Sequence, residues 1–424
     1  MTQEASLRLD PERLRELFDL RGEVYEHRGG AFDVDLDPLF NELRESGPVH
    51  EGGPGPMVGF HGEAVFQGLP FPERPHFTAF DYATCNEVLH DLEGYSSSPH
   101  APGSEEFLHE STILYMDGDR HRRYRSLVQP SFVPKRTHWW VDRWVHATVH
   151  GLIDRIEAKG RSDLNIEFCA PIPLLTICGS FGVSVADALS IRAAVTSDVT
   201  SSEGTGIDRF IQIVSPIIAA RRAEPKDDLI SVLVQAELTD EDGSRHVLSD
   251  REVLGFSFLL LTAGSGTTWK QMGITINALL DHPEWLERVR EDESVLRDVI
   301  EESLRWKPTD PVFARFVIQD KTLSGVAVPK GSVIHLCFAS ANRDPARWER
   351  PDEFDPGRPV RSHLGFGSGA HVCLGMHVAR AEIHTAISAL VQRLPNLRRD
   401  PDAEPPRIVG MYERGPTGVP VIWG

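Results

Sequence analysis

The chain has 424 residues, of which 40% are hydrophobic and 25% are charged, as in an ordinary globular protein. Its formal net charge of −19 argues against nucleic acid and anionic membranes as partners, because both attract basic surfaces. No apolar run approaches the ~20 residues of a membrane-spanning helix, and the first residues lack the basic and apolar regions of a signal peptide. These features predict a soluble cytoplasmic protein.

The cysteines are odd in number and form no C-x-x-C pair, so neither a disulfide framework nor a zinc site is predicted. They are Cys85, Cys169, Cys178, Cys337 and Cys373. The length alone would allow two or three domains. No change of composition, internal repeat or low-complexity segment divides the chain, and we expect one domain over residues 1–424.

The first part of the chain mixes irregular and regular patterns. Residues 1–60 carry clustered proline and glycine and predict an irregular lead-in. Residues 76–80 alternate like a short strand, and residues 83–92 favour a helix. Residues 96–112 are rich in turn formers without periodicity, which predicts a long loop of the kind that is usually functional or mobile.

A basic segment follows in this acidic protein. His121 and Arg125 lie four residues apart and therefore share one face of a predicted helix. Arg120, Arg122 and Arg123 point elsewhere. The run is either a solvated charged face or a docking patch for an acidic partner.

Helices are expected over residues 139–222, with breaks at 159–160 and 202–206. A helix of roughly thirty residues is then predicted over 249–281, and it is apolar nearly all round in its first half, as a buried central helix should be. Glycines at 264 and 266 disfavour that helix by about 1 kcal/mol each relative to alanine. Two explanations are open, a close helix crossing or a local widening that makes room for a diatomic ligand.

Residues 295–306 predict a further helix, in which Glu302 and Arg305 share a face and can pair. An E-x-x-R pattern alone is a weak signal. Residues 313–319 and 332–338 are apolar and β-branched, and they predict two strands separated by a proline–glycine turn.

Residues 364–375 place four glycines around Cys373 and lead into a strongly helical run. Glycine lets the backbone pass close to a flat, bulky object. The helix N-terminus is expected to lower the pKa of the Cys373 thiol and to favour the thiolate. A lone cysteine is more often a small buried hydrophobe, but a thiolate in such a loop suits the axial ligand of a haem iron.

The pattern Phe366-Gly367-x-Gly369-x-His371-x-Cys373-x-Gly375 resembles the haem-binding loop of the cytochrome P450 family. The resemblance extends from about Phe77 to the end. It implies a mainly α fold (α+β), the cytochrome P450 fold, with one large helical domain and small β-sheets around a buried haem b.

The resemblance also implies roles for individual residues. Cys373 would bind the iron, and the haem propionates would be bound by His121, Arg125, Arg315 and His371. Glu302 and Arg305 would form a structural ion pair, with either Arg358 or His363 as third partner. The substrate pocket would be lined by Leu261, Phe313, Met411 and Tyr412, together with the 96–112 loop.

The middle of the long helix departs from the family's A-G-x-[D/E]-T-T pattern, because Gly266 stands where the acid belongs. Thr267 and Thr268 are retained as expected catalytic residues. In the family the acid and the threonine matching Thr267 help to deliver protons for oxygen activation, and a hydroxyl cannot replace a titrating carboxylate as the proton source. The proton would then come through water, from the substrate or from another residue, for which Glu413 is a candidate.

The expected reaction is reductive activation of O₂ and hydroxylation or dealkylation of a small, largely apolar organic substrate. Because only a short stretch follows Cys373, we expect no fused reductase and a separate ferredoxin or flavodoxin with its NAD(P)H-dependent reductase. The missing acid also motivates a peroxide-driven peroxygenase or peroxidase, or a reductase of small ligands such as nitric oxide. A haem-binding sensor or carrier would need a partner domain to transmit its signal, and no such domain is predicted. A helical protein without haem would leave the four glycines, Cys373 and the spaced histidine and arginine residues unexplained.

Overall fold

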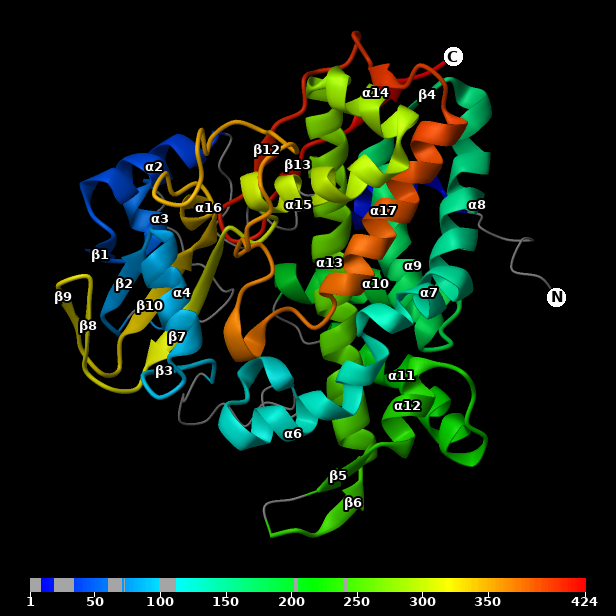
Figure 1. The fold of residues 1–424 in the computed structure, drawn as a ribbon. Coiled ribbons are helices and arrows are strands. Elements are labelled where there is room, and N and C mark those ends of the chain that lie inside the picture. The colour runs from blue at the N-terminus through cyan, green and yellow to red at the C-terminus, as the bar shows by residue number, and fades with distance from the viewer. Residues whose placement is uncertain are drawn as a thin grey trace.

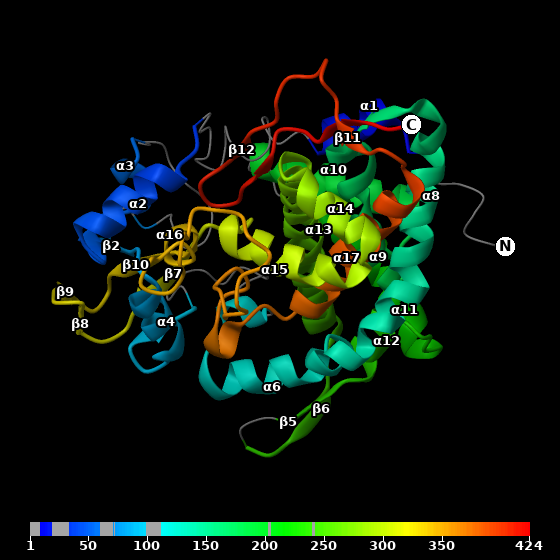
Figure 2. The same cartoon turned by 45° about the horizontal axis from the view of Figure 1, so that its top comes forward.

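The computed structural model describes residues 9–18, 34–59, 71, 73–98, 112–201, 205–239 and 242–424, with only the backbone for 196–201 and 205–206. A helical part lies on one side, and a smaller part with most of the strands lies on the other (Figure 1). The segment that precedes α17 runs between these two parts, and the turned view agrees (Figure 2).

Helices dominate the described chain. The α-helices are α1 Pro11–Leu17, α2 Asp37–Ser46, α3 Pro54–Met57, α4 Tyr82–His90, α6 Gly118–Val128, α7 Thr137–Trp140, α8 His146–Ile156, α9 Pro171–Ser180, α10 Val185–Ser201, α11 Thr205–Ala223, α12 Leu229–Gln235, α13 Asp250–Asp281, α14 Pro283–Glu291, α15 Leu296–Trp306, α16 Phe338–Ala341 and α17 Met376–Arg393. The strands are β1 Val49–Glu51, β2 His76–Ala79, β3 Tyr95–Ser96, β4 Arg161–Asp163, β5 Glu237–Thr239, β6 Arg245–Val247, β7 Val312–Val317, β8 Lys321–Leu323, β9 Val326–Val328, β10 Val333–Cys337, β11 Arg398–Arg399, β12 Ile408–Val409, β13 Gly415–Pro416 and β14 Pro420–Ile422.

Helix α13 is the central element of the helical part, as its sequence predicted. Ser249 caps it through a capping box, in which Ser249 and Glu252 each bind the other's backbone N–H. Its neighbours include α9, α11, α15 and α17. Because partners surround it, its buried residues lie on all faces, which explains why the sequence shows no polar stripe.

The largest sheet has the strand order β1-β2-β10-β7-β3. Strand β10 runs parallel to β2 and antiparallel to β7, and all five of its residues are buried. The predicted strands over 76–80, 313–319 and 332–338 are confirmed as β2, β7 and β10. The hairpin β8–β9, which is inserted between β7 and β10, was not predicted from the sequence.

The expectation of an irregular lead-in over residues 1–60 is wrong for the described part, which contains α1, α2, β1 and α3. A buried ion cluster explains how α2 is anchored. The Asp37 carboxylate lies 2.9 Å from Lys307 Nζ, 3.0 Å from Arg343 Nη2 and 2.7 Å from Arg414 Nη1. Although burial alone would raise the pKa of Asp37, the three cations hold it well below its usual range.

Within the described residues, no single helix is long and apolar enough to cross a membrane. A bent pair, Asn165–Ser180 with Val185–Val195 at 111°, meets that length and composition test only when the two are taken together.

Candidate active site

The loop around Cys373 joins a short 3₁₀ turn at Gly369–His371 to α17. The Cys373 N–H donates to the Phe366 carbonyl at 2.9 Å and closes the loop. Gly369 has a φ of +70°, and a Cβ there would lie 2.3 Å from the Leu89 carbonyl oxygen of α4. This glycine is therefore required by its positive φ and by its close packing against the backbone of α4.

Protein surrounds the Cys373 side chain on all sides, but its surface is not covered by packed atoms. The sulfur therefore faces a space inside the fold. Burial raises the pKa of its thiol to about 11, and the N–H of Gly375 offsets this only in part. The expected lowering of this pKa by the helix N-terminus is thus wrong for the polypeptide alone. A cation bound by the sulfur would deprotonate it outright.

The middle of α13 is also partly exposed. Ala263 is exposed there although most of the following half of the helix is buried. The Thr267 hydroxyl donates to the Ala263 carbonyl at 3.1 Å, and Thr268 is buried. The helix is continuous through this segment. A Cβ on Gly266 would lie 3.2 Å from Glu413 Oε1, so the space beside this glycine is taken by a carboxylate from another element.

Four predicted binding residues gather near Cys373. The rings of His121 in α6 and His371 lie 4.0 Å apart between their centroids. Arg125, one turn beyond His121, donates from Nη2 to the Val372 carbonyl at 2.7 Å. Burial, with His371 and Arg125 nearby, lowers the pKa of His121 to about 4, and Arg315 also contributes. The structure thus brings these four residues together, and their binding of haem propionates stays a prediction.

Asp117 belongs to this cluster and was not predicted from the sequence. Its Oδ1 lies 3.6 Å from His371 Nε2, and Ser96 donates to its carboxylate. Although burial alone would raise the pKa of Asp117, His371 and Ser96 hold it at about 2. A polar residue at the start of α6 is a common helix cap, so the sequence held no distinct signal for this contact.

Several features fit a haem carrying two carboxylates. His121 Nε2 is buried without a hydrogen-bond partner in the described structure. Arg315 is buried and donates from Nη1 to the Ala314 carbonyl, and burial lowers its pKa to about 10. Buried donors of this kind favour an acidic ligand. An added Cβ at Gly367 or Gly375 would meet nothing within 4 Å, as expected where a flat group lies against the backbone.

The ion pair predicted in α15 is present and buried. Arg305 donates to both oxygens of Glu302, from Nε at 2.7 Å and from Nη2 at 2.8 Å. Arg358 Nε donates to Glu302 Oε1 at 2.8 Å and is therefore the third partner. The alternative, His363, lies 3.3 Å from Glu301 instead.

Glu301 links α15 to α17 and to the cysteine loop, and its loss should weaken the protein mainly above pH 4. Although burial alone would raise the pKa of Glu301, His363 and Arg380 hold it at about 2. A lowered carboxyl pKa stabilises the fold above the unfolded value of about 4.3 and ceases to do so as the pH falls through about 2. We expect Glu301→Gln to lower the unfolding free energy by about 1–2 kcal/mol at neutral pH, after allowance for solvent screening.

Denaturant unfolding of both proteins between pH 7 and pH 2 measures this difference, which should shrink toward low pH. Glu293→Gln is the control, because that carboxylate is half exposed and lies 3.8 Å from His384. A constant difference across the whole pH range would contradict the assignment.

Comparisons with known proteins agree with this geometry. Residues 206–410 match the family model of cytochrome P450. The cytochrome P450 monooxygenase PikC of Streptomyces venezuelae is 34% identical over 409 residues, which are 93% of this chain and 92% of that protein. The chain belongs to the cytochrome P450 family.

Two further P450s are similar to this chain in sequence or in structure. The mycinamicin IV hydroxylase/epoxidase of Micromonospora griseorubida is 33% identical and matches 81% of this chain and 88% of its own length. The structure of CYP109E1 from Bacillus megaterium in complex with testosterone has a TM-score of 0.78 at 27% identity, covering 92% of this chain and 100% of that one. As a member of this family, the protein is a monooxygenase whose cofactor is haem b.

Of the four side chains predicted for the pocket of this P450 outside the 96–112 loop, Phe313 is the one that is partly exposed. Leu261 is packed into the main core. Met411 and Tyr412 are buried in a separate apolar cluster with residues of α2 and β10, which corrects their assignment to the pocket. Residues 99–111 of the predicted loop lie outside the described residues.

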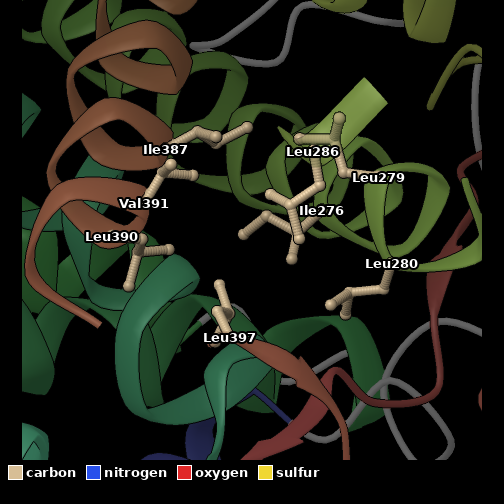
Figure 3. Close-up of a pocket in the computed structure, with 8 residues that line it drawn as sticks. All are labelled: Ile276, Leu279, Leu280, Leu286, Ile387, Leu390, Val391 and Leu397. Carbon is tan, nitrogen blue, oxygen red and sulfur yellow. The ribbon is translucent and has the colours of Figure 1, made fainter. Parts of the chain in front are cut away.

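A small apolar cavity elsewhere in the P450 is distinct from this site (Figure 3). It is lined by Ile276, Leu279, Leu280, Leu286, Ile387, Leu390, Val391 and Leu397. These side chains come mainly from α13, α14 and α17 and contain only carbon (Figure 3). Because no polar group is present to orient a ligand, the cavity is a packing feature.

Proposed function

We propose that this P450 uses electrons from a separate ferredoxin or flavodoxin to hydroxylate or dealkylate a small, largely apolar organic substrate. The observation that carries the proposal is the Cys373 thiol, which is surrounded by protein yet open to interior space beside buried cationic side chains. Haem bound through a thiolate supplies the electron density that favours cleavage of the O–O bond.

The residues of the chain would bind and orient that group. Cys373 would be the axial ligand, and His121, Arg125, Arg315 and His371 would bind the propionates through charge-assisted hydrogen bonds. Neutral His121 would donate from Nε2, which has no other described acceptor. Thr267 would hold and pass on a proton beside the exposed face of Ala263.

The apolar substrate class is supported by Phe313, which is partly exposed and whose ring centroid lies 5.5 Å from Cζ of Arg315, and by relatives such as CYP109E1, whose structure contains testosterone. The electron donor would dock on the outer face of α6. Arg122 is exposed there, and Arg125 of the same helix contacts the cysteine loop. A basic patch on a protein of net charge −19 would orient an acidic donor.

We further propose that the whole chain forms one domain, because its largest apolar cluster joins residues from Leu9 to Trp423. The cytoplasmic location stays a prediction from the sequence.

The test is to purify the protein, reduce it, add carbon monoxide and record the absorption spectrum. A red-shifted, thiolate-type band is expected, and an imidazole-type band would contradict the ligand assignment. Product formation from apolar aromatic and terpenoid compounds is then measured twice, once with ferredoxin plus NADPH as the driver and once with hydrogen peroxide, and the two rates are compared. Turnover that depends on the electron-transfer chain supports the proposal.

Gly266 favours a second candidate, a peroxide-driven peroxygenase or peroxidase, or a reductase of small ligands such as nitric oxide, because these reactions do not need the missing acid in the same way. Turnover with peroxide alone, at or above the rate with the electron donor, would favour the peroxide-driven enzyme. Nitric oxide consumption without substrate oxidation would favour the reductase.

A further inference from the structure

We infer that Glu413 takes the place of the acid that α13 lacks at Gly266, and that it acts with Lys270 as a positioning group for proton delivery through Thr267. The inference goes beyond monooxygenase activity itself, because it assigns the proton path to an element other than the helix that usually carries it. It rests on the buried side chains of Glu413 and Lys270 and on the partly exposed side chain of Asp310, which come from three elements.

The first observation is the position of Glu413. It lies in the turn between β12 and β13, far from Gly266 in the sequence. Its Oε1 is nevertheless 3.2 Å from the point where a Cβ on Gly266 would lie. The carboxylate therefore occupies the space that a side chain on Gly266 would enter. Glycine at this position is what leaves that space for it.

The second observation is a buried partner on the same helix. Lys270 Nζ lies 2.5 Å from Glu413 Oε1, and the two side chains are 3% and 8% exposed. Lys270 is one turn beyond Gly266, so an acid at 266 would share a face with it. Burying such a pair is weakly stabilising at best. This buried pair lies next to Gly266, the residue before Thr267, and stability alone does not explain why it is there.

The third observation is Asp310, in the segment between α15 and β7. It is partly exposed, and its charged neighbours are Glu413 and Lys270, with Cys373 also within electrostatic range. Burial, followed by the charge of Glu413, raises the pKa of Asp310 to about 7. A carboxyl group with such a pKa can both hold and release a proton near neutral pH.

The inferred path carries one proton from solvent to the reacting oxygen through Asp310, Glu413 and Thr267. Asp310 gives its proton to Glu413, directly or through water, and Glu413 passes it to the Thr267 hydroxyl oxygen as Thr267 releases its own hydroxyl proton toward the reacting oxygen. A proton from solvent then restores Asp310. The charge of the cluster is unchanged over the cycle, and the electrons come only from the redox partner.

The central test compares Glu413→Gln, which removes the acid but keeps its volume, with the wild-type holoenzyme. A positioned proton donor typically contributes about 10²–10⁴-fold. Because water can still reach Thr267, we expect product formation to fall roughly 10- to 100-fold. We also expect more of the consumed electrons to appear as hydrogen peroxide, and a larger solvent isotope effect on turnover. Coupling is the fraction of consumed electrons that ends in product. Unchanged coupling and an unchanged isotope effect would overturn the inference.

Two further variants separate chemistry from folding. Lys270→Met combined with Glu413→Gln leaves no unpaired charge, so it should fold and show the same uncoupling. Asp228→Asn is the structural control, because it weakens another buried pair, 2.5 Å from Arg221, away from the site. If Asp228→Asn lowers both the melting temperature and the coupling, then a loss of coupling follows from lost stability alone. Glu413 would in that case have only a structural role.

A swap tests whether the acid can return to the helix. Gly266→Glu with Glu413→Ala places the carboxylate one turn before Lys270, and coupling should recover. The matched variant Gly266→Gln with Glu413→Ala has no acid and should stay uncoupled. Equal behaviour of these two variants would overturn the inference.

A measurement that needs no turnover tests the cluster itself. The infrared band of the protonated Asp310 carboxyl, identified by its loss in Asp310→Asn, is titrated with pH. Its midpoint should fall in Glu413→Gln, because a negative charge that raises the pKa is removed. It should rise in Lys270→Met for the opposite reason. A midpoint unaffected by either change would show that these groups are not coupled.

Discussion

Replacing Cys373 by alanine is expected to abolish the red-shifted carbonyl band of the reduced protein and to remove monooxygenase activity. The sulfur is the only metal-binding side chain assigned to the site, and within the described part of the chain no group of three or more His, Cys, Asp or Glu residues is placed to hold a metal ion. Spectra of reduced protein with carbon monoxide, together with product analysis, measure the effect.

Cys178→Ala is the matched control, because Cys178 is a buried cysteine of α9. It should keep the band and lose only the free energy of a small core truncation, about 1 kcal/mol. A Cys373→Ala protein that retains a thiolate-type band would refute the assignment of the ligand.

Asp37→Asn should cause the largest loss of stability among the changes considered. The carboxylate is the shared partner of Lys307, Arg343 and Arg414, all of which are buried. Removing one partner of a buried ion cluster leaves uncompensated charge, and we expect the unfolding free energy to fall by at least about 3–5 kcal/mol. Denaturant unfolding followed by circular dichroism measures this change.

Asp352→Asn is the control for this prediction. Asp352 also pairs with Arg343, at 2.8 Å, but its side chain is 58% exposed. Exposed pairs contribute little, so about 1 kcal/mol or less is expected. Similar losses in the two variants would show that Asp37 is not the anchor of the cluster.

The parts of the fold that the sequence could predict are those determined by local patterns. The serine cap and the continuous apolar composition were sufficient to place α13, and the β-branched runs were sufficient for β7 and β10. The hairpin β8–β9 also had a local signal. Ser324 and Gly325 both adopt positive φ, at +48° and +86°, and a Ser–Gly pair is a known turn signal.

Contacts between distant segments could not be predicted in the same way. The partners of Asp37 are hundreds of residues away along the chain, and no pattern in the sequence connects them. Burial of Met411 and Tyr412 depends on how the C-terminal turn packs against α2, which composition does not determine. The pKa of the Cys373 thiol could not be predicted locally either, because burial by distant segments raises it more than the nearby helix N-terminus lowers it.

The candidate site illustrates both cases. His121 and Arg125 were predicted together because helical spacing places them on one face. Glu413 was only a candidate from the sequence, because its approach to Gly266 depends on the turn between β12 and β13. Arg358 could be chosen over His363 only from its contact with Glu302.

The ion cluster at Asp37 and the pairing of β14 with β4 constrain the order of events during biosynthesis. Arg414 leaves the ribosome 377 residues after Asp37 (414 minus 37), which at about 5–20 residues per second is a delay of roughly 20–75 s. Strand β4 likewise cannot pair until β14 has been synthesised. The nascent chain therefore holds Asp37 without its full set of cations and β4 without its partner strand through most of translation, and it completes its fold only after the segment containing residues 414–422 has emerged.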